Sequence, residues 1–472
     1  MSAEQREAVL VLTGRGGMAV LVGQAGTGKG VVIRAAREAW ERDGQRVIGT
    51  AVAGATAKRL GADAQIGHTV TADALILRHA GGELVLDGRT VVVMDEAAMA
   101  DTRRLAALTD ATARSGSKLV LVGDCAQLSP LGAGGLFERV RREAPSAQPT
   151  EVHRVREDWE RRAWGQLRGG QPDRALAEYR ARGRLHVDGT RDEAAERMVA
   201  DWDRARRGRP PGRVLMLTDA SNVELDRINA LAQQRRAQAG ELGQRRVPVP
   251  GRPYGLGAGD RVMLTGQLRV PGAERVENGI TGEVLAVEPR EQRVRLRTAE
   301  SPPRELDFST GEFADVRLAY AQHVYKAQGA TVDRALVLTG GWQTDRERSY
   351  VAFTRARERT DVYVSREDLG EAGLDAGAIA RLGERMAVSR SQQASITQPQ
   401  RNARPDVERS PAGERLGGDI APRADAAIEQ QEGVITRPVG GDDVRESRVG
   451  RILREQREAE RERARDEGLG LG

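Results

Sequence analysis

The most constraining feature of this sequence is a glycine-rich run, residues 23–30, that separates two segments of different periodicity. Residues 18–22 read Met-Ala-Val-Leu-Val, which is typical of a buried parallel strand, and residues 31–42 carry apolar side chains at helical spacing. Strand, glycine loop and helix is the order in which backbone N–H groups and a helix N-terminus surround a phosphate. The run therefore predicts a nucleotide-binding P-loop made of Gly23, Gln24, Ala25, Gly26, Thr27, Gly28, Lys29 and Gly30.

Lysine usage singles out the last charged residue of this loop. Only four of the 74 basic residues are lysine, at positions 29, 58, 118 and 326. A compact ammonium fits between two phosphates where a planar guanidinium does not, so we expect Lys29 to contact the β- and γ-phosphates of ATP. The next residue is Gly30, where the pattern has Ser or Thr to hold Mg²⁺. Either water or another group holds the ion, or the site is impaired.

The composition narrows the class of protein. The chain has 472 residues, enough for roughly two to four domains. Its 74 basic and 69 acidic residues leave a net charge of only +5, so any attraction for nucleic acid must come from local basic patches. We find no long apolar run and no signal sequence, and the single cysteine, Cys125, excludes an internal disulfide and a cysteine-cluster metal site. We expect a cytoplasmic protein with no membrane partner.

The order of patterns along the chain predicts an α/β fold. Strand and helix signals alternate up to about residue 140 and begin again near residue 213, which indicates two parallel sheets covered by helices. Residues 155–207 read as helical. Short alternating segments within 247–312 predict a small β-barrel insertion. The predicted organisation is a first domain at 1–150, a helical connector at 151–210, a second domain at 211–246 and 313–372, the insertion at 247–312, and a largely disordered tail at 373–472 with an Arg/Glu-rich terminal helix.

Acidic and amide side chains follow two more predicted strands. Asp95 and Glu96 come directly after the apolar run 90–94, and Gln127 follows the run 118–122. Downstream of a phosphate loop, such a carboxylate pair supplies a Mg²⁺ ligand through Asp95, which we expect to act through water, and a base for the attacking water through Glu96. Gln127 is expected to contact the γ-phosphate. These residues predict ATP hydrolysis with Mg²⁺ as the metal.

Seven blocks of the sequence occur in an order that resembles one family. They are Gln5, residues 23–30, residues 95–98, residues 123–128, Arg154, residues 319–331 and residues 350–357. This order resembles the superfamily-one DNA helicases of the RecD-like branch and is most similar to the helicase half of the MobF-type conjugative relaxases, the TraA family. The resemblance covers about residues 2–370. It implies two tandem RecA-like motor domains of the P-loop NTPase type, with an SH3-like barrel inserted in the second.

The resemblance also implies roles for individual residues. Gln5 is similar to the glutamine that reads adenine, and Arg154 and Arg355 resemble two arginines that stabilise transition-state charge. With these arginines, the implied catalytic set contains Lys29, Asp95, Glu96 and Gln127. The residues implied to bind DNA are Thr50, Lys58, Thr218, Asn222, His323, Lys326, Gln328 and Thr331. Many relatives have Thr and His where this chain has His323 and Tyr325.

The activity that the resemblance implies is ATP-dependent translocation along single-stranded DNA, 5′ to 3′, in conjugative transfer or DNA processing. A separate relaxase or the conjugation machinery is a further implied partner. One alternative is a non-motor ATP- or DNA-binding accessory protein whose hydrolysis has decayed through Gly30. A complete relaxase is not expected, because the sequence has no N-terminal tyrosine pair with a histidine cluster.

Two expectations concern how DNA is held. The segment 218–222 follows a predicted strand and either grips the DNA backbone or is only a capped helix start. Because aromatic residues make up only 3% of the chain, strand binding is expected to rest mainly on phosphate contacts rather than on base stacking.

Overall fold

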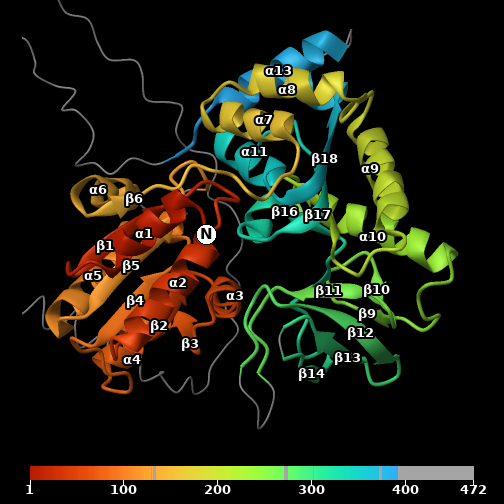
Figure 1. Cartoon of the computed structure of the whole chain (residues 1–472). Helices are drawn as coiled ribbons and strands as arrows, with labels where there is room; N and C mark the ends of the chain where they lie inside the picture. Colours follow the sequence, from red (N-terminus) through yellow and green to blue (C-terminus); the bar gives the residue numbers. More distant parts are fainter. Residues whose placement is uncertain (129, 131–133, 270–274, 301, 371–374, 392–472) are drawn as a thin grey trace, which may run out of the picture. The chain divides into compact units, whose positions relative to one another are not determined.

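The computed structural model describes residues 1–128, 130, 134–269, 275–300, 302–370 and 375–391. Within these residues the chain forms two parallel sheets covered by helices, one five-stranded antiparallel sheet and one short antiparallel strand pair (Figure 1). The predicted α/β fold with two parallel sheets is confirmed. The tail beyond residue 391, with its predicted terminal helix, lies outside the described residues.

The first parallel sheet has the strand order β3-β2-β4-β5-β1-β6. Its strands are β1 (Met18–Val22), β2 (Arg46–Ala51), β3 (His68–Thr71), β4 (Thr90–Met94), β5 (Lys118–Gly123) and β6 (Ser146–Ala147). They alternate with α1 (Ala3–Thr13), α2 (Lys29–Arg42), α3 (Gly54–Ala64), α4 (Ala72–Ala80), η1 (Ala97–Met99), α5 (Thr102–Ser115) and α6 (Leu136–Glu143). The central strands are apolar on both faces, since α1 and α2 bury one face while α4 and α5 bury the other.

The second parallel sheet has the order β16-β8-β17-β18-β7. Its strands are β7 (Leu185–Asp188), β8 (Val214–Thr218), β16 (Ala321–His323), β17 (Val332–Leu338) and β18 (Ala356–Ser365). The helices around it are α7 (Asp158–Arg168), α8 (Pro172–Ala181), α9 (Arg191–Arg206), α10 (Asn222–Gln238), η2 (Val324–Ala327), α11 (Arg346–Phe353), α12 (Arg366–Leu369) and α13 (Asp375–Ala387). One face packs against α7, α8, α11 and α13, and the other against α9 and α10. No helix in the described part of the chain is long and apolar enough to cross a bilayer.

Two segments differ from the sequence-based interpretation. The helical interpretation of residues 155–207 is wrong at 185–188, where β7 pairs in parallel with β18. A strand of four residues at a sheet edge is too short to produce a clear alternation. The predicted disordered tail is also wrong at its start, because α13 buries Ala378, Leu382 and Met386 in the core of the second sheet. Burial of an apolar helical face, rather than composition alone, decides that this segment is ordered.

The insertion is an antiparallel sheet in the order β14-β13-β12-β11-β15 (Figure 1, green). Its strands are β11 (Arg261–Leu264), β12 (Thr281–Glu288), β13 (Arg293–Thr298), β14 (Glu305–Ser309) and β15 (Val316–Leu318), preceded by a separate pair, β9 (Val247–Pro248) and β10 (Gly255–Leu256). Its apolar side chains join the core under α9 and α10. Closure of this sheet into an SH3-like barrel stays a prediction.

Candidate functional site

The P-loop adopts a backbone form that requires glycine at two positions. Gly26 and Gly28 have φ values of +87° and +79°, a region that other L-residues rarely adopt. A Cβ atom at residue 26 would lie 2.5 Å from the Cβ of Arg154, and one at residue 28 would lie 2.6 Å from the Nε2 atom of Gln5. Helix α2 begins directly after Gly28 without a side-chain cap. Its first N–H groups are therefore available to an anion.

A cavity of about 550 Å³ opens in front of this loop. Its lining comes from two stretches of the chain. The first stretch contributes residues 24–30, Arg59, Asp63, Asp95, Glu96 and Gln127, and the second contributes His153, Arg154, Arg156, Thr331, Asp333, Arg355, Arg357 and Glu358. The Nζ atom of Lys29 donates to the backbone carbonyl of Gly23 at 2.8 Å. The structure therefore brings together all six residues of the implied catalytic set, and they come from both halves of the chain.

Two arginines line the cavity together with the P-loop: Arg154, which lies directly against Gly26, and Arg355, which follows α11. Burial lowers the pKa of Arg154 to about 9, and the neighbouring Arg355 acts in the same direction. Burial also lowers the pKa of Arg355, to about 10. Both groups remain cationic at neutral pH, and they donate to backbone carbonyls and to the hydroxyl of Thr354 rather than to carboxylates. Buried charges without a counter-ion are costly, so an anionic ligand such as a triphosphate would stabilise this arrangement.

The carboxylate pair lies at the carboxyl end of β4, inside the cavity. Burial and the adjacent Glu96 raise the pKa of Asp95 to about 6, against the opposing effects of Lys29 and Arg59. Glu96 has a φ of +50°, which is uncommon for a residue with a side chain and often marks a functional constraint. Its Oε2 atom accepts a hydrogen bond of 3.0 Å from Gln328. Gln328, which the resemblance assigns to DNA, thus contacts a residue of the nucleotide cavity, while its own side chain lines a separate cavity.

Sequence reasoning did not identify Tyr350 as a site residue. The buried Tyr350 hydroxyl accepts a hydrogen bond from the backbone N–H of Ala25 in the P-loop at 3.2 Å and donates to Asp124 at 3.2 Å. Asp124 also accepts from Arg168 at 2.5 Å and from Gln127 at 3.3 Å. Tyr350 stands in the block 350–357, but an aromatic residue in a helix gives no signal about where its hydroxyl points. The hydroxyl joins α11 to the loop that binds phosphate.

Gln5 lies beside the P-loop but outside the cavity lining. Its Nε2 atom donates to the backbone carbonyl of Thr27 at 3.1 Å, and its Oε1 atom accepts from the backbone N–H of Ser2 at 3.0 Å. The second bond is part of a capping box that starts α1. The role of Gln5 in reading adenine stays a prediction.

The site can accommodate Mg²⁺ only with ligands from outside the protein. Gly30 carries no side-chain oxygen, and the described residues contain no group of three or more His, Cys, Asp and Glu that could hold a metal ion. Mg²⁺ commonly keeps several waters and binds phosphate oxygens with one or two carboxylates. A single carboxylate contact through water, from Asp95, is compatible with that preference.

Two of the implied DNA contacts are wrong. The side chains of Thr50 and Thr218 are fully buried at the ends of β2 and β8. The Thr218 hydroxyl accepts from the backbone N–H of Ala220 at 3.1 Å, which closes a local turn. A family block aligned to a strand end does not reveal which of its side chains face the sheet interior. The segment 218–222 contains a capped helix start, because the hydroxyl of Ser221 accepts from the backbone N–H of Glu224 at the start of α10.

Three other implied DNA contacts, Lys326, Gln328 and Thr331, line a second cavity of about 400 Å³, whereas Lys58, Asn222 and His323 do not. The Lys58 Nζ atom lies 2.6 Å from a carboxylate oxygen of Glu300 in the insertion. The Oδ1 atom of the exposed Asn222 accepts from Arg317 at 2.7 Å and lies 3.1 Å from the Nε2 atom of His323.

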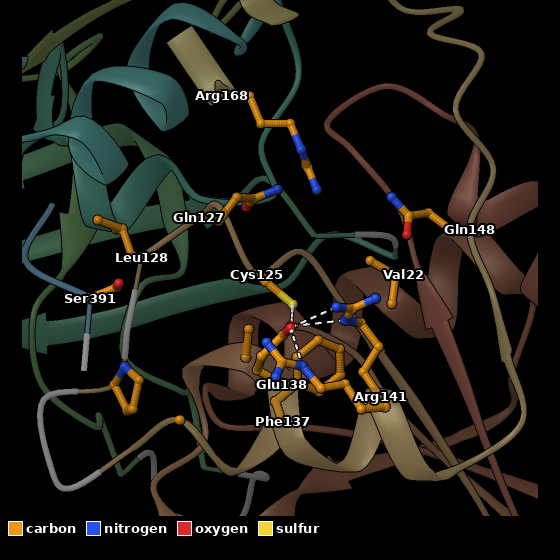
Figure 2. Close-up of a pocket in the computed structure, with 14 residues that line it drawn as sticks. Val22, Cys125, Gln127, Leu128, Phe137, Glu138, Arg141, Gln148, Arg168 and Ser391 are labelled. Atoms are coloured by element: carbon orange, nitrogen blue, oxygen red, sulfur yellow. Dashed lines mark hydrogen bonds and ion pairs between the residues drawn. The ribbon is translucent and has the colours of Figure 1, made fainter. Parts of the chain in front are cut away.

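A further cavity of about 500 Å³ surrounds the only cysteine (Figure 2). The Cys125 thiol donates to the Glu138 carboxylate at 2.9 Å, and Arg141 donates to the same carboxylate at 2.6 Å. Burial, and then the hydrogen bond to Glu138, raise the pKa of Cys125 to about 12. Gln127 lines both this cavity and the nucleotide cavity. The thiol is thus held protonated next to the nucleotide site.

Known proteins are similar in sequence to most of this chain. A family model for an AAA domain matches residues 1–190. The chain is 34% identical over 364 residues to the conjugal transfer protein TraA of Agrobacterium fabrum, which is 77% of this chain and 32% of that protein. It is 29% identical over 373 residues to the ATP-dependent RecD2 DNA helicase of Deinococcus radiodurans, which is 76% of this chain and 48% of that protein. The chain is related to TraA and to the RecD-like helicases of superfamily one.

The family resemblance seen in the sequence is therefore confirmed. This RecD-like chain spans about a third of the length of the TraA protein and about half of the RecD2 helicase. Among solved structures, it is similar to the Pif1 helicase from Candida albicans, with a TM-score of 0.49 and 19% sequence identity over 80% of this chain and 96% of that one.

Proposed function

We propose that this chain is an ATP-dependent helicase or translocase that moves 5′ to 3′ along single-stranded DNA, in conjugative transfer or DNA processing. The observation that supports this most strongly is that two cationic side chains, the partly buried Arg154 and the fully buried Arg355, line the same cavity as the P-loop. A nucleotide held between the loop and these arginines contacts both halves of the chain. Such a site can convert binding and release of phosphate into relative motion.

Each residue of the cavity has a role in this proposal. Lys29 neutralises charge on the β- and γ-phosphates, and Arg154 and Arg355 stabilise the charge that develops as the γ-phosphate leaves. Glu96 accepts a proton from the attacking water. Asp95, through water, would hold Mg²⁺, which supplies further neutralisation of the phosphate oxygens.

Two hydrogen bonds provide the means to couple hydrolysis to DNA. Gln328 donates to Glu96, and it stands two residues from Lys326 in the channel that we assign to DNA. Tyr350 joins α11 to the P-loop. A change at the γ-phosphate can therefore shift the segments that hold the strand through these two hydrogen bonds.

The test is ATP hydrolysis by the purified protein with and without single-stranded DNA, followed by strand displacement on duplexes with a 5′ or a 3′ tail. We expect DNA to stimulate hydrolysis, displacement only from the 5′ tail, and loss of both in the Lys29→Ala variant. Arg34→Ala, on the same helix but outside the cavity lining, is the control. No stimulation by DNA, beside an active helicase control, would refute the proposal. Displacement from the 3′ tail alone would refute the polarity.

A non-motor accessory protein is the second candidate, and it is favoured by Gly30, which lacks the usual metal-binding hydroxyl. This candidate predicts nucleotide and DNA binding without displacement from either tail. A separate relaxase or the conjugation machinery is the partner that we propose for the helicase, and co-purification with a relaxase from the same transfer system tests it.

A further inference from the structure

We propose that Tyr325 is a stacking platform for one base of the bound single strand, in the cavity between residues 52–56, η2 and the insertion. This inference rests on the proposed function, because it names how that strand is held. It also revises the expectation, drawn from the low aromatic content, that binding rests mainly on phosphate contacts.

The cavity has the composition of a nucleic-acid channel. Its volume is about 400 Å³, and its lining includes Thr56, Arg261, Asn278, Tyr325 and Lys326. These residues come from α3, the insertion and η2, so an occupant touches three parts of the fold. Arg59, Glu96 and Thr331 line both this cavity and the nucleotide cavity. A strand bound here is therefore adjacent to the hydrolysis site.

Tyr325 stacks on a buried histidine and is itself about half exposed. Its ring stacks on the His323 ring with centroids 5.4 Å apart and an interplanar angle of 16°. His323 is buried and bonded to Asn222, whereas 51% of Tyr325 is exposed. The imidazole stacks on one face of the tyrosine, and about half of the tyrosine stays exposed. A ring that is held by stacking and is still half exposed can offer its accessible part to a nucleobase.

The surrounding charges suit a nucleotide. Burial, and then Arg317, lower the pKa of His323 to about 4, so the imidazole beneath the ring stays neutral at physiological pH. The Lys326 ammonium lies 5.8 Å from the Tyr325 ring centroid and 3.0 Å from the Asn278 side chain. A base stacked on the ring thus places its phosphate near the Lys326 ammonium. Lys326 can exchange its hydrogen bond to the neutral Asn278 amide for a contact with that phosphate.

Tyr325 is also distinguished from the other aromatic residues. In the described residues, the large apolar side chains that are exposed include two aromatic ones, Tyr325 and Trp342. Trp342 is 73% exposed but does not line the cavity. The pair provides a matched comparison of two exposed rings, only one of which lies in the proposed channel.

The experiment measures binding of a labelled oligothymidylate and of an abasic strand of equal length, without nucleotide, by fluorescence anisotropy. We expect Tyr325→Ala to weaken binding of the oligothymidylate by about 5- to 100-fold, and Tyr325→Phe and Trp342→Ala to change it by less than about two-fold. On the abasic strand, Tyr325→Ala and the wild type should bind equally. The salt dependence should be unchanged in Tyr325→Ala but shallower by about 0.7 in Lys326→Ala.

Equal binding of the oligothymidylate by Tyr325→Ala and the wild type would overturn the platform, and so would an equal loss on the abasic strand. Either result leaves the proposed function intact, because the wild type still binds the strand. Failure of the wild type to bind either strand would overturn both the platform and the proposed function.

Discussion

Replacing Tyr350 by Phe removes a single oxygen atom that joins the P-loop to α11. The backbone N–H of Ala25, which is buried, loses its partner at 3.2 Å. An unsatisfied buried donor costs about 1–3 kcal/mol. Asp124 loses less, because it still accepts from Arg168, Gln127 and the backbone. Since the broken bond joins the P-loop to a helix of the second sheet, we expect the cost to fall on the closed, hydrolysing arrangement and to lower kcat for ATP by about 5- to 100-fold.

The assay is steady-state ATP hydrolysis with saturating single-stranded DNA, together with urea unfolding of the same samples. Tyr179→Phe is the matched control: it also removes a fully buried hydroxyl, which donates to Glu160 at 2.9 Å, but that bond does not touch the P-loop. We expect Tyr179→Phe to lower the free energy of unfolding by about 1–3 kcal/mol and leave kcat nearly unchanged. If both variants lower kcat equally, or if Tyr350→Phe leaves it unchanged, the reasoning about the Tyr350 hydroxyl is refuted.

Three further predictions follow from single contacts. Glu300→Gln frees Lys58 and should tighten single-strand binding by less than about five-fold, as expected for a partly exposed ion pair; weaker binding in the anisotropy assay would contradict this. Because its pKa is raised to about 12, Cys125 should react with iodoacetamide at pH 8 roughly a thousand-fold more slowly than a free cysteine, and Glu138→Gln should accelerate the labelling measured by mass spectrometry; a fast wild-type reaction would be inconsistent. A Cβ at residue 30 meets only ordinary van der Waals contact, so Gly30→Ser should fold normally and lower the Mg²⁺ concentration that gives half-maximal ATPase; an unchanged Mg²⁺ requirement would show that a hydroxyl there adds no ligand.

Local chemistry made the phosphate loop predictable. Gly26 and Gly28 are needed for their backbone angles, and the strand and helix on either side have clear periodicities, so the loop could be recognised before any contact was known. The positions of Arg154 and Arg355 in the site were predictable only through the family resemblance. Nothing in the residues around Arg154 indicates that it meets a loop more than a hundred residues earlier in the chain.

Side-chain direction was not predictable in the same way. Thr50 and Thr218 lie in blocks that resemble DNA-gripping segments, yet both point into the protein. The bond from Gln328 to Glu96 and the position of Tyr350 depend on how two separate sheets face each other. Such contacts are non-local, and a pattern in one segment carries no information about its distant partner. The strand β7 was missed for the opposite reason, since its local signal is too short.

The strand order of the second sheet has a consequence for synthesis on the ribosome. Its last strand, β18, lies between β17 and β7, so β7 cannot join that sheet until residues up to 365 have been made. The first sheet is complete at residue 147. At about 5–20 residues per second, roughly 10–40 s separate the two events. For most of that interval the nascent chain can already fold its phosphate loop but does not yet contain Tyr350 or Arg355. The phosphate loop can thus form well before Tyr350 and Arg355, which are proposed to support hydrolysis, have been synthesised.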